Sequence, residues 1–340
     1  MQNDSQVYRL VKGDDCLQLK KSSQAKAALR PHDIRIQVHA ASLNYRDLLP
    51  MRGPIDDTRD GLIPLSDAAG AVLEVGSAVT RWKVGDRVAP TFFSGWQSGP
   101  FKKDHLATAL GGGSIDGVLS EQIVVPEHVV VEIPAHLSYA EAATLPCAGV
   151  TAWHALVERG GLKIGETVLI QGTGGVALFA LQLAAAIGAK PIVLSSSDQK
   201  LKRAIGLGAW KTVNYRTQPD WDQAVLDMTR GAGADHVLEL GGPDTFERSI
   251  ASVATGGKIA QIGVLTGFGP TPNLLPVQFL NANIHGICVG SGAHFSALNR
   301  FLETHRIKPV IDTEFTFDQI PQAYDHLASG QHFGKVVIRL

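Results

Sequence analysis

The sequence has almost no excess of either charge. Its 340 residues include 31 Lys and Arg against 32 Asp and Glu, a formal net charge of −1. Proteins that bind nucleic acid or an anionic membrane usually carry a clear surplus of positive charge. The charge balance therefore gives no reason to expect either partner.

Long apolar runs and a targeting segment are also missing. No run reaches the ~18–20 residues of a membrane span, and the longest, residues 176–189, fits a buried helix. The N-terminal stretch MQNDSQVYRL lacks the basic and then apolar regions of a secretory signal. The widely spaced Cys16, Cys147 and Cys288 fit a reducing compartment better than a disulfide framework. We therefore expect a cytoplasmic protein.

Residues 166–197 hold the clearest pattern in the chain. Strand-favouring residues at 167–170 lead into a glycine turn. Apolar residues at 3–4 spacing then predict one buried helix face, which Gly188 can end. A second buried strand follows at 191–194. The turn itself is G-x-G-x-x-A, placed between a strand and a helix.

This turn has the features of a dinucleotide site. Gly172 permits a tight turn, Gly174 lets the backbone approach a pyrophosphate, and an alanine follows where the helix must pack closely on the strand. The anion then lies against the unpaired N–H groups at the helix N-terminus. A P-loop is excluded because no Gly-Lys-Ser/Thr follows. The predicted cofactor contacts in the turn are Gly172, Thr173, Gly174, Gly175 and Val176.

The chain is long enough for two domains, and its character changes twice. Residues 1–137 contain short strands punctuated by Gly and Pro, as in a small barrel-like sheet, with an irregular lobe at 92–116. Residues 138–290 alternate strands and helices, which predicts a doubly wound parallel six-stranded sheet in an α/β fold. Residues 291–340 are again mixed. We expect one domain from 1–137 and 291–340, and a dinucleotide-binding domain from 138–290.

The end of the second predicted strand indicates which dinucleotide binds. An acidic residue about 20 residues after the glycines holds the ribose hydroxyls of NAD. That position is Ser195, followed by Ser196 and Ser197, whose hydroxyls can donate to the extra phosphate of NADP. Lys200 and Arg203 follow, where they either bind this phosphate or form a solvated helix face. We expect NADPH, with NADH less favoured.

Several motifs together resemble the medium-chain dehydrogenase/reductase superfamily. They are GTGGVA at 172–177, NYRD at 44–47, PCAGVTAW at 146–153 and FGKVV at 333–337. The resemblance covers essentially the whole chain, and its branch is that of quinone oxidoreductase-like and NAD(P)-dependent alcohol dehydrogenase-like proteins. It implies a GroES-like catalytic domain, a Rossmann cofactor domain, hydride transfer to or from a small-molecule substrate, and a homodimer or homotetramer.

The departures from the superfamily pattern concern zinc. Zinc-dependent members hold the catalytic metal on a Cys, a His-Glu pair and a second Cys, and the aligned positions here are Asn44, Ser66, Asp67 and Cys147. A catalytic zinc needs about three protein ligands, and Cys147 with Asp67 supplies two at most. The four cysteines of the structural zinc have no counterpart in residues 92–116. We therefore expect no zinc at either site.

The motif Asn44-Tyr45-Arg46-Asp47 resembles that of zinc-independent quinone reductases and enoyl reductase domains. The resemblance places Asn44 near the nicotinamide, where its amide donates to a carbonyl oxygen or caps the loop. Tyr45 is a proton donor, a ring stacked on the cofactor, or a packing residue. Arg46 binds a substrate carbonyl or carboxylate, or forms a surface salt bridge. Asp47 is expected to hold the loop by accepting hydrogen bonds.

Further cofactor contacts follow from the resemblance or from the ends of strands. Thr151 aligns with a residue that contacts the nicotinamide, and Tyr215 with one that stacks near the 2′-phosphate. At the ends of the fourth and fifth strands, where open sheets bind ligands, the candidates are Gly241, Gly263, Val264 and Leu265. Ordinary turn formation is the alternative for these four. Lys335 either reaches the cofactor or is an exposed lysine.

These features lead to one hypothesis about function and two alternatives. Without a Lewis acid, nothing lowers the pKa of an alcohol hydroxyl, whereas a quinone, enone or enoyl-type acceptor itself delocalises the charge that a hydride brings. We therefore expect an NADPH-dependent, zinc-independent reductase of such acceptors. The alternatives are an alcohol or aldehyde dehydrogenase of the same superfamily, and an NADPH-binding sensor or interaction protein without turnover.

Overall fold

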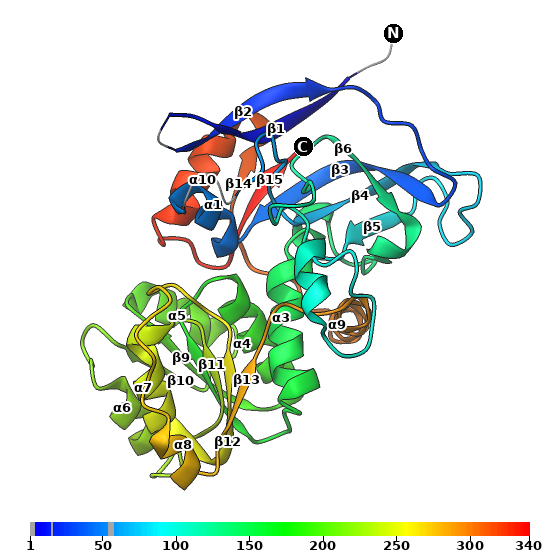
Figure 1. The fold of residues 1–340 in the computed structure, drawn as a ribbon. Helices are drawn as coiled ribbons and strands as arrows, with labels where there is room; N and C mark the ends of the chain where they lie inside the picture. The colour runs from blue at the N-terminus through cyan, green and yellow to red at the C-terminus, as the bar shows by residue number, and fades with distance from the viewer. Residues whose placement is uncertain (1–3, 15, 54–57) are drawn as a thin grey trace. The chain divides into compact units, whose positions relative to one another are not determined.

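The structure is a computed structural model that describes residues 4–14, 16–53 and 58–340. The chain forms two compact units (Figure 1). Unit 1 comprises residues 1–150 and 290–340, and unit 2 comprises residues 151–289. Among the described residues, no helix combines the length and the apolar character that a bilayer crossing requires.

Unit 1 is built mainly on antiparallel strands. They are β1 (Ser5–Lys12), β2 (Leu17–Gln24), β3 (Asp33–Leu43), β4 (Asp67–Val75), β5 (Arg87–Pro90), β6 (Gln122–Pro126), β7 (Val130–Glu132), β14 (Ile311–Thr316) and β15 (Lys335–Arg339). β1 and β2 form a hairpin. The larger sheet has the order β14-β15-β3-β4-β5-β7, with β6 also paired to β3, and β14 runs parallel to β15.

Helices of unit 1 pack against this sheet or connect its strands. They are η1 (Tyr45–Leu48), α1 (Leu49–Arg52), η3 (Lys103–Thr108), η4 (Glu127–Val129), α2 (Tyr139–Ala142), the π-helix η5 (Leu145–Gly149), α9 (Gly292–His305), η7 (Phe317–Gln319) and α10 (Ile320–Ala328). The amphipathic helix α10 buries Ile320, Ala323 and Leu327 in the core that β3 and β4 also form. This core gives β3 and β15 a fixed relative position.

The alternation of apolar and polar residues at 34–39 predicts a half-buried strand, and β3 confirms the strand. The same alternation predicts that the polar residues face solvent, and this is wrong for Arg35, which is 3% exposed. The Arg35 guanidinium donates to the Glu74 carboxylate at 3.0 Å and to the Ala27 carbonyl oxygen. These partners allow a charged side chain to be buried on the second face of the strand.

The irregular lobe near residues 92–110 has a core of its own. Aromatic residues in such a lobe can either line a pocket or form a core, and Phe92, Phe93 and Trp96 are all buried. The ring of Trp96 stacks on that of His105 with centroids 5.7 Å apart. Aromatic packing therefore contributes to holding this lobe together.

Unit 2 contains one parallel sheet, and all of its residues are described. Its strands are β8 (Thr167–Gln171), β9 (Lys190–Ser195), β10 (Lys211–Asn214), β11 (Ala234–Glu239), β12 (Val253–Gln261) and β13 (Asn283–Gly286). The order of these six strands, β10-β9-β8-β11-β12-β13, and their parallel pairing confirm the predicted doubly wound sheet. The order reverses between β8 and β11, and open α/β sheets bind ligands beyond the carboxyl ends of strands at such a point.

The helices of unit 2 connect the parallel strands. They are α3 (Val150–Trp153), which begins in unit 1, the π-helix η6 (His154–Arg159), α4 (Gly175–Ile187), α5 (Asp198–Gly206), α6 (Trp221–Met228), α7 (Pro243–Ser252) and α8 (Leu275–Phe279). Gly188 ends α4 in the left-handed conformation (φ 88°), as the sequence predicts. Trp221 of α6 and Phe246 of α7 pack in one core with strand residues such as Leu169.

Candidate active site

The NYRD residues follow directly from β3 and form the 3₁₀ turn η1. Asn44 caps this turn in an extended conformation. The Asp47 carboxylate accepts the Asn44 backbone N–H at 2.7 Å, and the Asp47 N–H donates to the Asn44 carbonyl oxygen at 2.9 Å. Both side chains are buried. Asp47 therefore holds the loop by accepting a hydrogen bond, as the sequence analysis expects.

Lys335 reaches the same place from near the C-terminus. It is the first residue of β15, which pairs antiparallel with β3 so that Val336 lies opposite Leu43. The Lys335 ammonium donates to the Leu43 carbonyl oxygen at 2.6 Å and to the Asn44 side-chain oxygen at 2.5 Å. Because Lys335 is only 3% exposed, the alternative of a solvent-exposed lysine is wrong.

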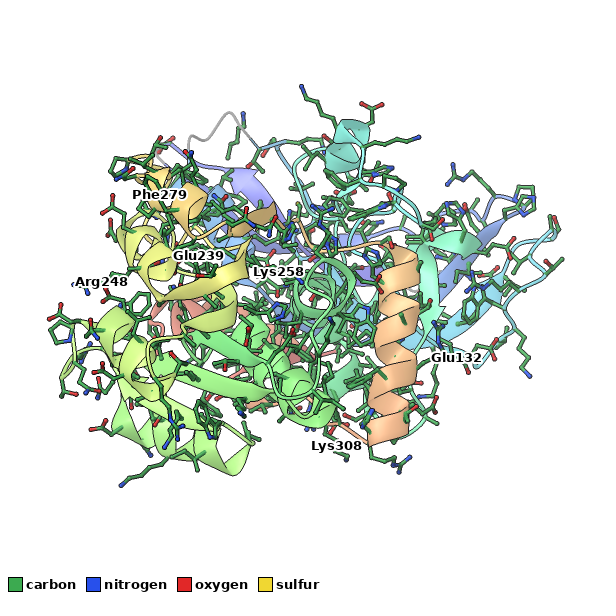
Figure 2. All side chains as sticks on the ribbon, turned by 90° about the horizontal axis from the view of Figure 1, so that it is seen from below. Glu132, Glu239, Arg248, Lys258, Phe279 and Lys308 are labelled. Carbon is green, nitrogen blue, oxygen red and sulfur yellow. The ribbon has the colours of Figure 1, made fainter. Side chains whose placement is uncertain are left out.

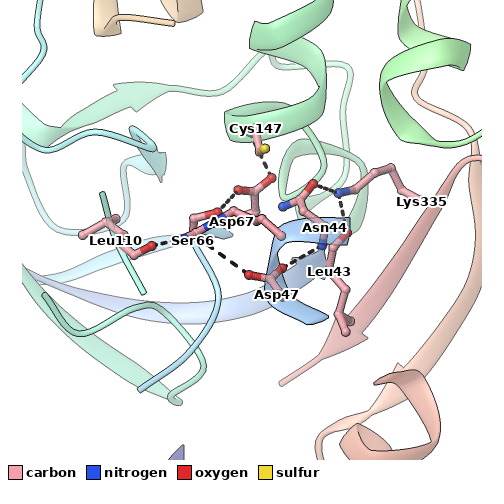
Figure 3. Close-up of polar contacts among 9 residues, drawn as sticks. Leu43, Asn44, Asp47, Ser66, Asp67, Leu110, Cys147 and Lys335 are labelled. Carbon is pink, nitrogen blue, oxygen red and sulfur yellow. Dashed lines mark hydrogen bonds and ion pairs between the residues drawn. The ribbon is translucent and has the colours of Figure 1, made fainter. Parts of the chain in front are cut away.

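Asp67 lies on the other side of Asn44 from Lys335 (Figure 3). Its side chain is fully buried. One carboxylate oxygen accepts the Ser66 hydroxyl at 2.6 Å, and the other accepts the Cys147 backbone N–H at 3.0 Å. Burial raises the pKa of Asp67, and the charge of Lys335 is the largest influence that opposes this rise. An ammonium and a carboxylate thus flank one buried amide.

Burial also shifts the other titratable groups of this cluster. It raises the pKa of Asp47 to about 6, against the lowering effects of the Arg46 charge and the Asn44 backbone N–H. It raises the pKa of the Cys147 thiol, which therefore stays protonated at neutral pH. The pKa of Tyr324 is raised by burial and by the charge of Asp47. The cluster therefore contains a carboxyl group, Asp47, that titrates in the range where enzymes work.

Arg46 and Tyr45 make contacts with the lobe and the core of unit 1. The Arg46 guanidinium lies over the Phe92 ring, 4.9 Å from its centroid, and donates to the Leu110 carbonyl oxygen at 2.9 Å. Tyr45 packs against the core, and the Arg52 guanidinium lies 6.0 Å from its ring centroid. The structure therefore ties Arg46 to the lobe and gives Tyr45 a packing role.

In unit 2 the predicted glycine turn follows β8. Gly172 has φ 79°, a conformation that favours glycine. Gly174 caps α4, whose first residues are Gly175 and Val176, and Thr173 is buried beside them. The first N–H groups of a helix have no partner within the helix. The turn therefore has the backbone geometry that the sequence analysis expects for a pyrophosphate site.

Ser195 and Tyr215 are brought together by the pairing of β9 with β10. Ser195 ends β9, and its carbonyl oxygen accepts the Tyr215 N–H at 3.1 Å. Ser195 is buried, Ser196 is half-buried, and Tyr215 is 41% exposed. These three predicted cofactor residues therefore lie at one edge of the sheet.

α5 begins at the same edge. The Ser197 hydroxyl caps it by accepting the Lys200 backbone N–H at 3.4 Å, so Lys200 lies in its first turn. Asp198, which the sequence analysis did not consider, also lies in this turn, and its carboxylate accepts the Asn214 amide at 2.7 Å. An acidic group is therefore close to the expected phosphate position, although it already has a partner.

The loops after β11 and β12 lie against each other. A Cβ atom on Gly263 would stand 1.8 Å from the carbonyl oxygen of the residue before Gly241, so a side chain does not fit there. Thr266 donates its N–H to the Gly241 carbonyl oxygen at 2.9 Å. Between them, Val264 is half-buried and Leu265 is 54% exposed. The structure thus brings together all four candidates from these strand ends.

Known protein families match both the N-terminal and the C-terminal part of the chain. The family described as Alcohol dehydrogenase GroES-like domain matches residues 30–135, and the family described as Zinc-binding dehydrogenase matches residues 175–304. A zinc-type alcohol dehydrogenase-like protein of Schizosaccharomyces pombe is 43% identical over 343 residues, which cover 98% of each chain. The chain belongs to the medium-chain dehydrogenase/reductase superfamily.

Further relatives of this dehydrogenase/reductase carry different names. A structure from Sinorhizobium meliloti 1021, described as a candidate alcohol dehydrogenase, is 42% identical, covers 100% of both chains and has a TM-score of 0.93. The 2-methylene-furan-3-one reductase of Solanum lycopersicum is 32% identical over 335 residues, 95% of this chain and 76% of the relative. The predicted superfamily and fold class, a GroES-like domain with a Rossmann sheet, are confirmed. The protein is an oxidoreductase of a superfamily that binds nicotinamide cofactors.

Two polar residues of this oxidoreductase escaped the sequence analysis. Gln171 and Glu239 end β8 and β11, and both are buried. A signal was present, because each is a polar residue that directly follows apolar strand residues, 168–170 in β8 and 237–238 in β11. Thr151, which was predicted, lies in α3 and is 3% exposed. Its contact with a nicotinamide stays a prediction.

Proposed function

We propose that this protein is a zinc-independent, NADPH-dependent reductase whose acceptor is a quinone, an enone or an enoyl-type compound. The observation that carries the proposal is the buried hydrogen bond from the Lys335 ammonium to the Asn44 side-chain oxygen. The superfamily pattern aligns Asn44 with a ligand of the catalytic zinc. In this chain the side chain at that position is hydrogen-bonded to the ammonium group of Lys335.

The residues at the aligned metal positions do not fit a zinc ion. The oxygen of Asn44 is already bound to Lys335, whose positive charge repels a divalent cation. Cys147 is the only cysteine among the aligned positions, and a catalytic zinc needs about three protein ligands. The Ser66 hydroxyl donates to Asp67. Within residues 4–14, 16–53 and 58–340, no three His, Cys, Asp or Glu side chains are grouped to hold a metal.

A dinucleotide does fit the carboxyl ends of the strands in unit 2. The conformation of Gly172 and the start of α4 suit a pyrophosphate. Ser195 and Ser196 present hydroxyl groups where the sequence analysis expects the 2′-phosphate of NADPH. Asp198 opposes a phosphate, but its carboxylate is bound to the Asn214 amide. This balance supports NADPH over NADH.

A reduced nicotinamide, when bound, supplies the hydride. Reduction of an enone or a quinone places negative charge on an oxygen of the acceptor, which then takes up a proton. Lys335 provides a buried positive charge that lowers the energy of such an oxyanion, and its Nζ holds a proton. Lys335 also fixes the orientation of the Asn44 amide, while Asp67 balances the charge. The residues of this chain thus contribute to the reaction by stabilising charge and by orienting groups.

The names of the relatives support more than one substrate class. The tomato relative is named for the reduction of 2-methylene-furan-3-one, an enone. The relatives from S. pombe and S. meliloti are named for alcohol dehydrogenases, and these names favour an alcohol or aldehyde dehydrogenase as the second candidate. A sensor without turnover is not favoured, because the superfamily consists largely of oxidoreductases.

The test combines cofactor oxidation with metal analysis of one preparation. We expect faster oxidation of NADPH than of NADH with benzoquinone or an α,β-unsaturated ketone, no stoichiometric zinc, and no loss of activity with a chelator. Zinc at about one ion per chain, required for turnover of simple alcohols, would overturn the proposal in favour of the second candidate.

A further inference from the structure

The two strands beside the reversal of the unit-2 sheet end in buried polar residues. Gln171 is the last residue of β8, and Glu239 is the last residue of β11. Glu239 is 0% exposed and Gln171 is 8% exposed. Glu239 and Phe279 are both labelled in Figure 2, and Phe279, in contrast to Glu239, is 78% exposed. A carboxylate buried at this place requires hydrogen-bond partners.

One oxygen of the Glu239 carboxylate organises the loop that leads into α7. It accepts the backbone N–H groups of Gly241 at 2.9 Å and Gly242 at 2.8 Å, and the Thr245 hydroxyl at 2.6 Å. Capping side chains accept N–H groups of the first helical turn, whereas these two N–H groups lie before that turn. The Glu239 carboxylate therefore fixes the backbone that leads into α7.

The other oxygen joins this loop to β8. It accepts the Gln171 amide at 2.8 Å and the Ser249 hydroxyl. The amide nitrogen of Gln171 also donates to Ser249 at 2.7 Å, and its oxygen accepts the N–H groups of Leu240 and Gly241, both at 3.0 Å. An amide has two N–H donors and two acceptor positions. All four positions of Gln171 are used, so its orientation is fixed.

The same residues connect three glycine loops. Gln171 directly precedes Gly172, the first glycine of the turn. Glu239 holds Gly241 through its carboxylate, and its backbone carbonyl oxygen accepts the Gly263 N–H at 3.0 Å. The loops after β8 and β11 are therefore tied to one carboxylate–amide pair, and the loop after β12 is tied to the backbone of Glu239.

We propose that Gln171 and Glu239 are positioning residues that keep these glycine loops in register for a dinucleotide. The inference rests on the proposed function, in that it takes the Gly172 turn as the cofactor's seat. The carboxylate is surrounded by uncharged donors, and every one of these donors belongs to a strand end, to a loop after it or to α7. Its role is to set the distance and direction between the loops.

Exchanging Gln171 and Glu239 distinguishes a role in positioning the loops from a contribution to the stability of unit 2 as a whole. Glu239→Gln sets two amide N–H groups against each other, and Gln171→Glu sets two carboxylates against each other. The double variant Gln171→Glu/Glu239→Gln restores one carboxylate and one amide in reversed positions, and the Ser249 hydroxyl can turn to donate to the new carboxylate. Glu247→Gln on the exposed face of α7 is the matched control.

Fluorescence titration measures the affinity of each variant for NADPH and for NADH. Thermal denaturation measures the stability of every variant. We expect each single variant to weaken binding of the preferred cofactor by at least about tenfold, because one buried charged hydrogen-bond network is broken. The double variant should return to within about threefold of the wild type. Adenosine 2′-phosphate, whose expected contacts lie at the end of β9, should bind all variants alike. The Glu247→Gln variant should behave as wild type.

Three results would overturn the inference. The single variants could bind the dinucleotide as tightly as wild type, or the double variant could bind as weakly as the single ones. Equal loss of adenosine 2′-phosphate binding would mean that unit 2 as a whole is disturbed. If the wild type binds neither NADPH nor NADH, the proposed function itself fails, and that outcome is distinct from the other three.

Discussion

Each unit contains a polar cluster around buried carboxylate groups, two in unit 1 and one in unit 2, and the two clusters are stabilised in different ways. In unit 1, Asp47 and Asp67 lie near Lys335 and Arg46, so charges face charges. In unit 2, the Glu239 carboxylate faces backbone N–H groups, an amide and two hydroxyls. The interaction between two charged groups changes in strength when one of them gains or loses a proton. Hydrogen bonds from uncharged donors do not change in this way and keep a fixed geometry.

Under the proposed function, this difference gives the two units different tasks. A cluster that contains an ammonium and a carboxyl with a pKa of about 6 can respond to a charge that develops on a substrate. A carboxylate held by neutral donors from the ends of two strands and from α7 is suited to keep a binding surface in shape. If this comparison is right, variants in unit 1 should alter turnover and its pH dependence, and variants in unit 2 should alter cofactor affinity.

The largest effect is expected from Lys335→Met. It removes the buried cation beside Asn44, so kcat should fall by at least about 100-fold while NADPH affinity stays unchanged. The Asp67 carboxylate would lose its main opposing charge, which should destabilise unit 1 by about 3 kcal/mol. Steady-state kinetics and hydrogen exchange of unit-1 peptides check these effects.

The double variant Lys335→Met/Asp67→Asn is the control for Lys335→Met. It removes both charges, so stability should recover while activity should not. Full activity in this double variant would refute a catalytic role for the charge of Lys335, and the unit-1 cluster would then be only structural.

The next largest effect is expected from Glu239→Ala. It leaves the N–H groups of Gly241 and Gly242 and the amide of Gln171 without their acceptor, and it opens a cavity in a fully buried site. Unit 2 should lose about 3 kcal/mol of stability. Hydrogen exchange should rise in the loops after β8, β11 and β12, with unit-1 peptides unchanged. Glu247→Ala, on the exposed face of α7, should cause no such change; an equal rise there would show that α7, and not the carboxylate, sets the loops.

An effect of similar size on stability, but confined to a defined pH range, is expected from Asp47→Asn. Burial raises the pKa of Asp47 from 3.8 to about 6. The folded state therefore binds this proton more tightly than the unfolded state. The resulting stability is fully present below pH 3.8 and is lost as pH rises through about 6. The loss is on the order of 3 kcal/mol, and the Asp47→Asn variant would not undergo it, because its amide does not ionise.

Thermal denaturation between about pH 4 and pH 8 checks this prediction. The stability of Asp47→Asn relative to wild type should increase as pH rises, and the exposed Asp104→Asn variant should show no such trend. Parallel pH profiles for wild type and Asp47→Asn would mean that Arg46 and Lys335 keep Asp47 ionised throughout. The contrast with the unit-2 network would then rest on hydrogen-bond geometry alone.

The fold was largely predictable because unit 2 has strong periodicity. Apolar strands, glycine turns and the stop at Gly188 are local signals, and the structure follows them. The π-helices η5 and η6 were not predicted, since they depend on packing that a helical period does not encode. Arg35 shows the same limit in unit 1, because only its partners reveal that a charged residue is buried.

The site was predictable residue by residue but not as an assembly. Asn44 and Lys335 were both candidates, yet 291 residues separate them, and their contact depends on the antiparallel pairing of β3 with β15. Gln171 and Glu239 are 68 residues apart and were missed. Neither belongs to a motif, and their importance comes from the strand order, which makes β8 and β11 neighbours.

The smallest effect is expected from Ser249→Ala, and it tests which member of the unit-2 network matters most. The Ser249 hydroxyl lies between Gln171 and Glu239, but those two residues also bond to each other directly. Its loss should therefore cost about 1 kcal/mol of stability in unit 2 and change NADPH affinity by less than about threefold. An effect as large as that of Glu239→Gln, measured by the same titration, would show that the hydroxyl bridge and not the carboxylate–amide pair sets the register of the loops. The fixed geometry that distinguishes the unit-2 cluster from the unit-1 cluster would then depend on the uncharged hydroxyl group of Ser249.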